Sequence, residues 1–135
     1  MDHLEWTIEH RESPGRHIVM KVSGRFTVEW CRRGIAELAA VKDPLAPLLF
    51  DDREVDFAGL SDLDLMEIGG FIAQYGPTFA YARIAVLVDG EHARDVADKW
   101  RRVTKGPSNS MIAVFEDEAE SIAWLTKNAG RDVND

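Results

Sequence analysis

The chain has 135 residues, of which 45% are hydrophobic and 30% charged, a balance typical of one folded domain rather than a disordered or fibrous chain. Its 24 Asp and Glu outnumber its 16 Lys and Arg, and the net charge of -8 argues against nucleic acid and anionic membrane surfaces as partners. The single cysteine, Cys31, excludes an internal disulfide. No apolar run approaches the roughly 20 residues of a membrane-spanning helix, so we expect no integral membrane segment and a cytoplasmic location.

The first third of the chain predicts a hairpin followed by a helix. Apolar and polar residues alternate over 6–10 and again over 17–23, and the Ser-Pro-Gly-Arg stretch at 13–16 between them is typical of a turn. Thr27 is placed to cap a helix over 28–41, whose apolar residues recur at helical spacing.

The middle third predicts two buried strands around a helix. The wholly apolar run 48–50 indicates a strand that is covered on both faces and ends before two aspartates. Ser61 and Asp64 resemble a capping box, which opens a helix to about Tyr75. The run 83–88 is the most apolar stretch of the chain and predicts a central strand.

The last third predicts a helix over 91–105 ended by Gly106-Pro107, a strand over 111–115 and a helix over 117–128. The whole order is β-β-α-β-α-β-α-β-α, which indicates an α/β fold with a five-stranded mixed sheet and four helices. Strands joined through helices pair in parallel, and the hairpin adds one antiparallel edge strand. We expect a single domain over 1–129 and a flexible C-terminal tail over 130–135.

Acidic residues directly follow the predicted parallel strands, at Asp51, Asp52, Asp89 and Glu116. Ligands of such sheets bind beyond the carboxyl ends of the strands, and an acidic rim there suits Mg²⁺. Acids at these positions also complement the positive ends of the helices that follow, without any ligand. We favour this second interpretation and predict no metal, no cofactor and no catalytic residue, with an enzyme that uses the acidic rim as the least favoured hypothesis.

Ser61 is the most informative polar residue because it starts a helix after a buried strand and a loop. A phosphate there would gain from the unpaired amide groups and the helix dipole, whereas the simpler interpretation is an N-cap hydroxyl. Small and apolar residues of the same helix fall outside its core-facing stripe and leave a second surface that suits a partner. These residues are Met66, Gly69, Gly70, Phe71 and Ala73.

The order of elements and three local motifs resemble the SpoIIAA-like branch of the STAS superfamily, the fold of anti-sigma-factor antagonists. The motifs are the hairpin leading to Gly24, the strand 48–51 with Ser61 downstream, and the stretch from Val114 to Ala119 that continues to Ala123-Trp124-Leu125. The resemblance implies that Ser61 stands where a partner kinase phosphorylates the second serine of an Asp-Ser-Ser-Gly motif. This chain has Gly59, Leu60 and Asp62 at the other motif positions, and Asp62 would repel a phosphate.

Two functions follow as hypotheses. The first is a non-enzymatic regulatory or protein-interaction module whose partner surface is formed by the loop 51–60 and the helix 61–75, with Gly59, Ser61, Asp62 and Phe71 as candidate contacts for an unknown regulatory protein or for a second copy in a homodimer. The second rests on the similarity of this branch to Sec14-type lipid-binding domains and is a pocket for an apolar small molecule or lipid. Its expected lining is Leu60, Leu65, Ile68, Phe71, Ile72, Phe79 and Tyr81.

Overall fold

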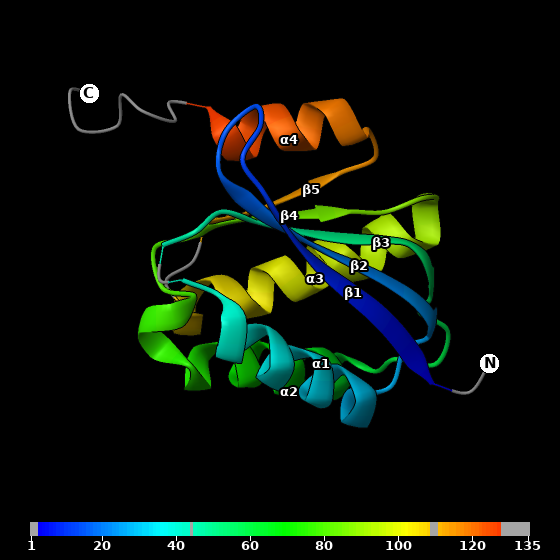
Figure 1. The fold of residues 1–135 in the computed structure, drawn as a ribbon. Coiled ribbons are helices and arrows are strands. Elements are labelled where there is room, and N and C mark those ends of the chain that lie inside the picture. Colours follow the sequence, from blue (N-terminus) through cyan, green and yellow to red (C-terminus); the bar gives the residue numbers. More distant parts are fainter. Residues whose placement is uncertain (1–2, 44, 109–110, 128–135) are drawn as a thin grey trace.

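The structure is a computed structural model that describes residues 3–43, 45–108 and 111–127 (Figure 1). The strands are β1 (Leu4–Arg11), β2 (His17–Arg25), β3 (Leu48–Asp56), β4 (Arg83–Leu87) and β5 (Met111–Phe115). The helices are α1 (Val28–Val41), α2 (Asp62–Gln74), α3 (Glu91–Ser108) and α4 (Glu118–Thr126), with the short 3-10 helix η1 (Gly76–Thr78) after α2. This order confirms the predicted α/β fold class.

The strands lie in the sheet in the order in which they occur in the chain. β1 is antiparallel to β2, and β2 to β5 are parallel to one another. Each parallel connection therefore moves one strand further in the same direction, and right-handed crossovers then place α1, α2 and α3 on one face of the sheet. Figure 1 shows these three helices together on that face and α4 on the other.

Successive side chains of the central strands point to opposite faces and enter two separate cores. Leu48 belongs to the larger core beneath α1, α2 and α3, whereas Leu49 packs with Leu125 in a smaller core beneath α4. Both leucines of β3 are almost completely buried. The wholly apolar run at the start of β3 is therefore explained by a strand that is covered on both faces.

The first three helices begin where the sequence predicts, and α4 begins one residue later, at Glu118. The Thr27 hydroxyl accepts a hydrogen bond at 3.3 Å from the backbone N–H three residues later. Ser61 and Asp64 form a complete capping box, in which the Ser61 hydroxyl accepts from the Asp64 N–H at 3.1 Å and the Asp64 carboxylate accepts from the Ser61 N–H at 2.9 Å. Asp117 caps α4 in the same way as Thr27 caps α1.

β3 is longer than the sequence predicts. The apolar run predicted an end at Phe50, but the strand continues to Asp56. Asp51 pairs with the last residue of β4, and beyond it β3 keeps β2 as its neighbour after an irregularity in the β2–β3 register. The prediction that Asp51 and Asp52 follow the strand is wrong because both lie within it.

α3 is also longer than predicted, since it runs to Ser108 through the Gly106-Pro107 pair that was expected to end it. Proline has a fixed φ that a helix accepts, and in the last turn its missing N–H removes one hydrogen bond. The predicted tail at 130–135 and the expected domain boundary at 129 lie outside the described residues.

α2 and α3 approach each other closely at Gly69. A Cβ built on Gly69 would lie 2.7 Å from Oγ1 of Thr104 and 3.4 Å from its Cα. Gly69 is buried, so the prediction that it belongs to a free surface of this helix is wrong. Gly70 is exposed with open space around it, and Met66 is 56% exposed, so both remain on the surface.

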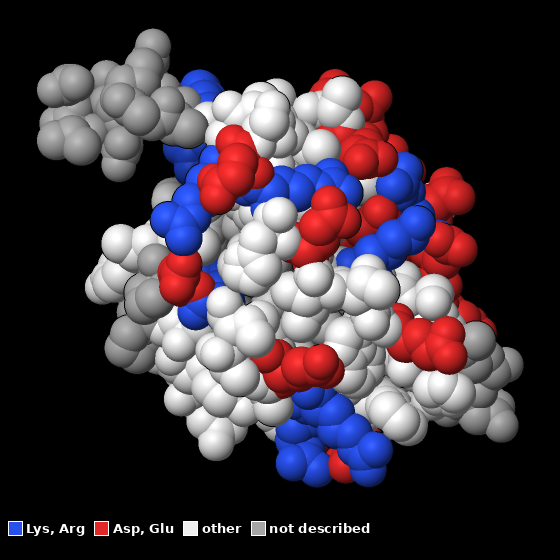
Figure 2. All heavy atoms as spheres, viewed as in Figure 1, with Lys and Arg blue, Asp and Glu red and all other residues white. Residues whose placement is uncertain are grey.

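Charged side chains of both signs are interspersed on the face shown in Figure 2. Many of them are paired, as in the contacts of Arg32 with Glu29 at 2.8 Å and of Arg16 with Asp43 at 2.7 Å. Exposed pairs of this kind contribute little to stability, about 0 to 1 kcal/mol each. On this face, therefore, acidic side chains lie among basic ones.

Candidate functional site

An apolar cavity of about 70 Å³ lies between the sheet and the three helices that cover its larger core. Its volume exceeds several-fold the roughly 10 to 15 Å³ that one water molecule needs. All three helices and the strands β1 to β4 contribute to its wall. The lining residues from the strands are Leu4, Trp6, Met20, Val22, Phe50, Asp52 and Val86, and those from the helices are Trp30, Cys31, Gly34, Ile35, Leu65, Ile68, Ile72, Val96, Ala97 and Trp100.

The cavity lies toward the carboxyl ends of the parallel strands. Phe26, which follows β2, and Phe57 and Leu60, which follow β3, complete its lining. The rings of Phe26 and Phe57 pack against each other with centroids 5.4 Å apart. Sheets with parallel strands bind ligands at this edge, because the loops that follow the strands are free to form a site there.

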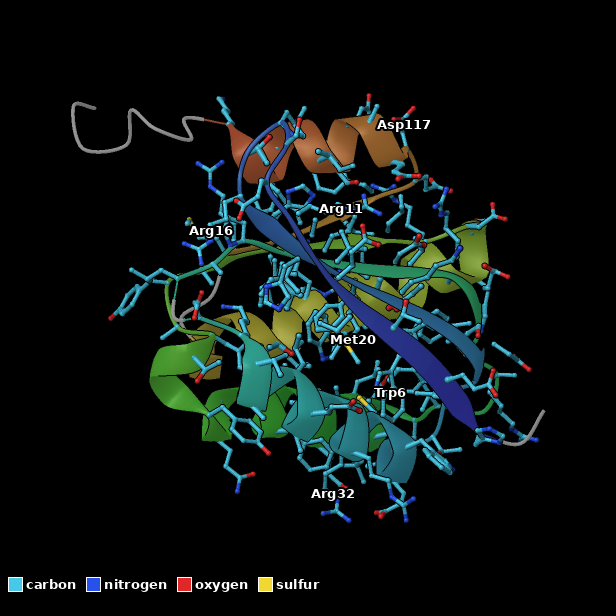
Figure 3. All side chains as sticks on the ribbon, in the orientation of Figure 1. Trp6, Arg11, Arg16, Met20, Arg32 and Asp117 are labelled. Atoms are coloured by element: carbon cyan, nitrogen blue, oxygen red, sulfur yellow. The ribbon has the colours of Figure 1, made fainter. Side chains whose placement is uncertain are left out.

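Gly34 of α1 allows the helix to lie close to β1 and β2 at the cavity wall. A Cβ on Gly34 would lie 3.2 Å from Cε of Met20 and 3.6 Å from the Trp6 ring. Figure 3 shows Trp6 and Met20 between the first two strands and α1. A larger residue at this position would project toward the flexible end of Met20 and narrow the cavity.

Aromatic rings from β1 and α1 form a half-buried rim. Trp6 donates its indole N–H to Glu37 at 2.6 Å, which fixes the ring between the strand and α1. Trp30 meets Trp6 edge to face at 6.2 Å, and the Arg33 guanidinium lies 4.6 Å from the centroid of the Trp30 ring. Both tryptophans are partly exposed and line the cavity, so this rim lies between the cavity and solvent.

Asp52 is the one carboxylic acid in the cavity wall. It lies on the same face of β3 as Leu48 and Phe50 because side chains alternate along a strand. Among the described residues, its carboxyl group has no hydrogen-bond or ion-pair partner. Burial of this group, and to a smaller extent the neighbouring Asp51 charge, raises the pKa of Asp52 to about 7, although part of the residue remains accessible.

Two further residues with polar groups, Trp100 and Cys31, line the cavity. Trp100 is 8% exposed, and its indole Nε1 has no hydrogen-bond partner among the residues that the structure describes. Cys31 is buried, as expected for a structural cysteine on an apolar stripe, and burial together with the Asp52 charge raises the pKa of its thiol. The thiol is therefore a weak nucleophile, whereas the indole N–H is an unused donor.

Two other acidic residues near the strand ends, Asp51 and Glu116, are engaged in ion pairs. Asp51 accepts hydrogen bonds from Arg53 at 2.9 and 2.8 Å, and Arg53 also reaches Glu118 at 3.0 Å. Burial opposes ionisation of Asp51, but the Arg53 contacts outweigh it and lower the pKa of Asp51. Glu116 pairs with Arg94 at 3.1 Å. Within the described part of the chain, no three His, Cys, Asp or Glu side chains gather in a way that could hold a metal.

The four candidate partner contacts lie in α2 or just before it, and none of them lines the cavity. The Ser61 hydroxyl is engaged in the capping box, and Asp62 is exposed and lies 3.7 Å from Nζ of Lys99. Gly59 is exposed with φ of +85°, a backbone conformation that favours glycine. Phe71 is half-buried at the edge of the larger core. The structure therefore brings Ser61, Asp62 and Gly59 together and leaves Phe71 further along the helix.

The residues expected to line an apolar pocket divide into two groups. Leu60, Leu65, Ile68 and Ile72 line the cavity, whereas Phe71, Phe79 and Tyr81 do not. Phe79 is fully buried against Tyr75 with ring centroids 6.2 Å apart, and Tyr81 is 69% exposed.

Sequence reasoning missed the contributions of Asp52, of Trp100 and of the first two strands to the cavity. Side chains alternate between the two faces of a strand, so a β3 extended past its apolar run would have placed Asp52 on the same face as Phe50. Trp100 lies on the core-facing side of α3, in the larger core. Its lack of a hydrogen-bond partner depends on the surrounding elements and has no signal in the sequence.

Four chains among solved structures match this one. One is the crystal structure of an uncharacterized protein from the DUF3478 family with a SpoIIAA-like fold, from Shewanella loihica PV-4. It is 24% identical to this chain, the match covers 93% of this chain and 95% of that chain, and the TM-score is 0.60. The chain therefore has the SpoIIAA-like fold that its motifs predicted. No family model matches the chain, and no curated protein matches it.

Within the described ranges, no helix is both long enough and apolar enough to span a membrane.

Proposed function

We propose that the chain binds a small, mostly apolar molecule in the cavity between the sheet and α1, α2 and α3. The observation that carries this proposal is the cavity itself, which is lined almost entirely by apolar side chains and bordered by half-buried Trp6 and Trp30. Ligand sites are typically concave and apolar, with a few polar groups that orient the ligand. Asp52 and Trp100 are polar groups of this kind.

The packing around the cavity also supports this function. Protein interiors leave few voids larger than a water molecule, and an unfilled apolar cavity lowers stability. A cavity of about 70 Å³ in a chain of 135 residues therefore lowers the stability of the folded state, and a bound ligand would remove this loss. Binding to the folded state alone would also stabilise it by mass action.

The experiment is a titration of the isotope-labelled protein with octanol, followed by the NMR signal of the Trp100 indole N–H. We expect a saturable shift of this signal and of neighbouring amides in α1 and β3. Ala97→Leu would fill the cavity from α3 and abolish the shift. Ala123→Leu adds the same volume at an exposed position of α4 and serves as the matched control.

Circular dichroism would show whether Ala97→Leu folds, and Leu60→Trp, at a half-buried position of the wall, is a second blocking variant. Octanol that gives no saturable shift with the unmodified chain would overturn the proposal. Binding that persists unchanged in both folded blocking variants would overturn it as well, because the ligand would then lie elsewhere.

A second candidate is the regulatory or protein-interaction module, with α2 as its partner surface. Leu63 and Met66 favour it, because they are 74% and 56% exposed on the same helix that Ser61 caps. Leu63→Lys would then remove binding of a purified protein partner or self-association measured by sedimentation, while Gln74→Lys, also exposed on α2, would not. The absence of enzymatic activity remains a prediction.

A further inference from the structure

We propose that the cavity selects molecules whose polar group donates a hydrogen bond and carries no negative charge, namely small apolar amines and alcohols, and that it rejects the matching carboxylates. This inference rests on the proposed function and adds the chemical class of the ligand. Asp52 and Trp100 are the residues that would make the distinction.

The carboxyl group of Asp52 lies at an apolar wall. An ionised carboxyl group at such a wall destabilises the folded protein when it has no partner. Among the described residues no Lys, Arg or His pairs with Asp52, in contrast to Asp51, which Arg53 satisfies. A ligand that donates a hydrogen bond, or that carries a positive charge, would supply the missing partner.

The indole N–H of Trp100 is a second polar group that a ligand could satisfy. This residue is more than nine-tenths buried and its Nε1 lacks an acceptor within the described part of the chain. A buried donor without a partner is destabilising, and a hydroxyl group accepts one hydrogen bond while it donates another. An alcohol therefore offers an acceptor for the Trp100 N–H as well as a donor for Asp52, whereas an alkylammonium ion offers only a donor.

The described residues of the cavity wall around Asp52 include no cationic side chain. Of the residues that line the cavity, Asp52 on β3 and Cys31 on α1 are the ones with ionisable side chains, while β1, β2, β4, α2 and α3 contribute none. Asp51, the residue before Asp52 on β3, also carries a negative charge, but that charge is paired with Arg53. A carboxylate ligand would meet negative charge in the cavity wall and no cation to offset it. The pKa of Asp52, raised by burial to about 7, is consistent with a site that holds no counter-charge.

The experiment compares octylamine, octanol and octanoate, which share one alkyl chain and differ in the polar group. Each would be titrated calorimetrically against the full chain at about pH 8, where Asp52 is mostly ionised. We expect octylamine and octanol to bind at least about ten-fold more tightly than octanoate. Asp52→Asn should reduce the preference for octylamine over octanoate to within about three-fold, and Asp95→Asn, at an exposed position of α3, should leave it unchanged.

Trp100→Phe distinguishes the two polar contacts. Removing the indole N–H should weaken octanol several-fold and leave octylamine nearly unchanged, because the ammonium group has no acceptor for that N–H. Equal binding of all three ligands, or tightest binding of octanoate, would overturn the inference and leave the proposed function standing. Failure of all three to bind would overturn both, so the two failures are distinguishable.

Discussion

Asp52 on β3 and Cys31 on α1 line one cavity, and burial, together with the charge of Asp52, raises the pKa of the Cys31 thiol. The two residues are 21 positions apart in the chain and meet because the crossover through α1 returns the chain to the strand beside β2. Each is a polar group in an apolar wall, and each therefore favours its neutral form. Their shared environment leads to the first two predictions.

We expect Asp52→Asn to stabilise the protein in a pH-dependent way. The folded-state pKa of Asp52 is raised from 3.8 to about 7, so the folded state binds a proton that the unfolded state has lost between these values. The stability that Asp52 contributes is complete below about pH 4 and is lost as the pH rises through 7. The variant should match the unmodified chain at about pH 4 and exceed it by roughly 2 to 4 kcal/mol at about pH 8, a range that allows for partial solvent access.

Urea unfolding between about pH 4 and pH 8 would measure this difference. Asp95→Asn, at an exposed position, should show no comparable pH-dependent gain. An Asp52→Asn curve parallel to that of the unmodified chain would mean that the carboxyl group is well solvated.

Native Cys31 should react slowly with iodoacetamide. Burial and the Asp52 charge raise its pKa, and the thiolate is the reactive form. We expect alkylation of the folded protein at about pH 8 to be at least about 100-fold slower than alkylation in urea, because each pKa unit lowers the thiolate fraction about ten-fold. Mass spectrometry of timed samples would follow the reaction, and comparable rates in the two conditions would contradict the buried position of the thiol.

The two adjacent glycines of α2 should respond to alanine in opposite directions. Gly69→Ala would place a Cβ 2.7 Å from Thr104 Oγ1 and force α2 and α3 apart, with an expected loss of roughly 1 to 3 kcal/mol. Gly70→Ala meets open space and should gain up to roughly 1 kcal/mol, because alanine favours the helix. Thermal unfolding of the two variants measures the contrast, and equal melting temperatures would show that α2 and α3 do not touch at this point.

Ser61 should act on stability through its hydroxyl. Ser61→Ala removes the acceptor for the Asp64 N–H and should cost about 1 kcal/mol. Ser61→Asp keeps an acceptor at the N-cap and should cost little. Denaturant unfolding compares the two variants. If Ser61→Ala were as stable as the unmodified chain, the capping box would contribute nothing and a different role for the hydroxyl would gain support.

The sequence by itself determined the order of the elements and the starts of α1, α2 and α3. These features depend on local patterns: Thr27, Ser61 and Asp117 cap helices through contacts three residues apart, and apolar residues recur at the period of each element. The α/β class with a five-stranded mixed sheet followed from the same patterns because the right-handed connection of parallel strands leaves few topologies. The SpoIIAA-like fold was implied by the resemblance of three local motifs.

The tertiary structure alone decided where the cavity lies and which residues line it. The length of β3 depends on pairing with β2, and that pairing places Asp52 inside the strand, where it faces the cavity. Likewise, the burial of Gly69 depends on its contact with Thr104. Elements distant in the chain determine that the Trp100 indole N–H has no hydrogen-bond acceptor among the described residues. Such contacts join residues far apart in sequence, and no local period encodes the space that remains between packed side chains.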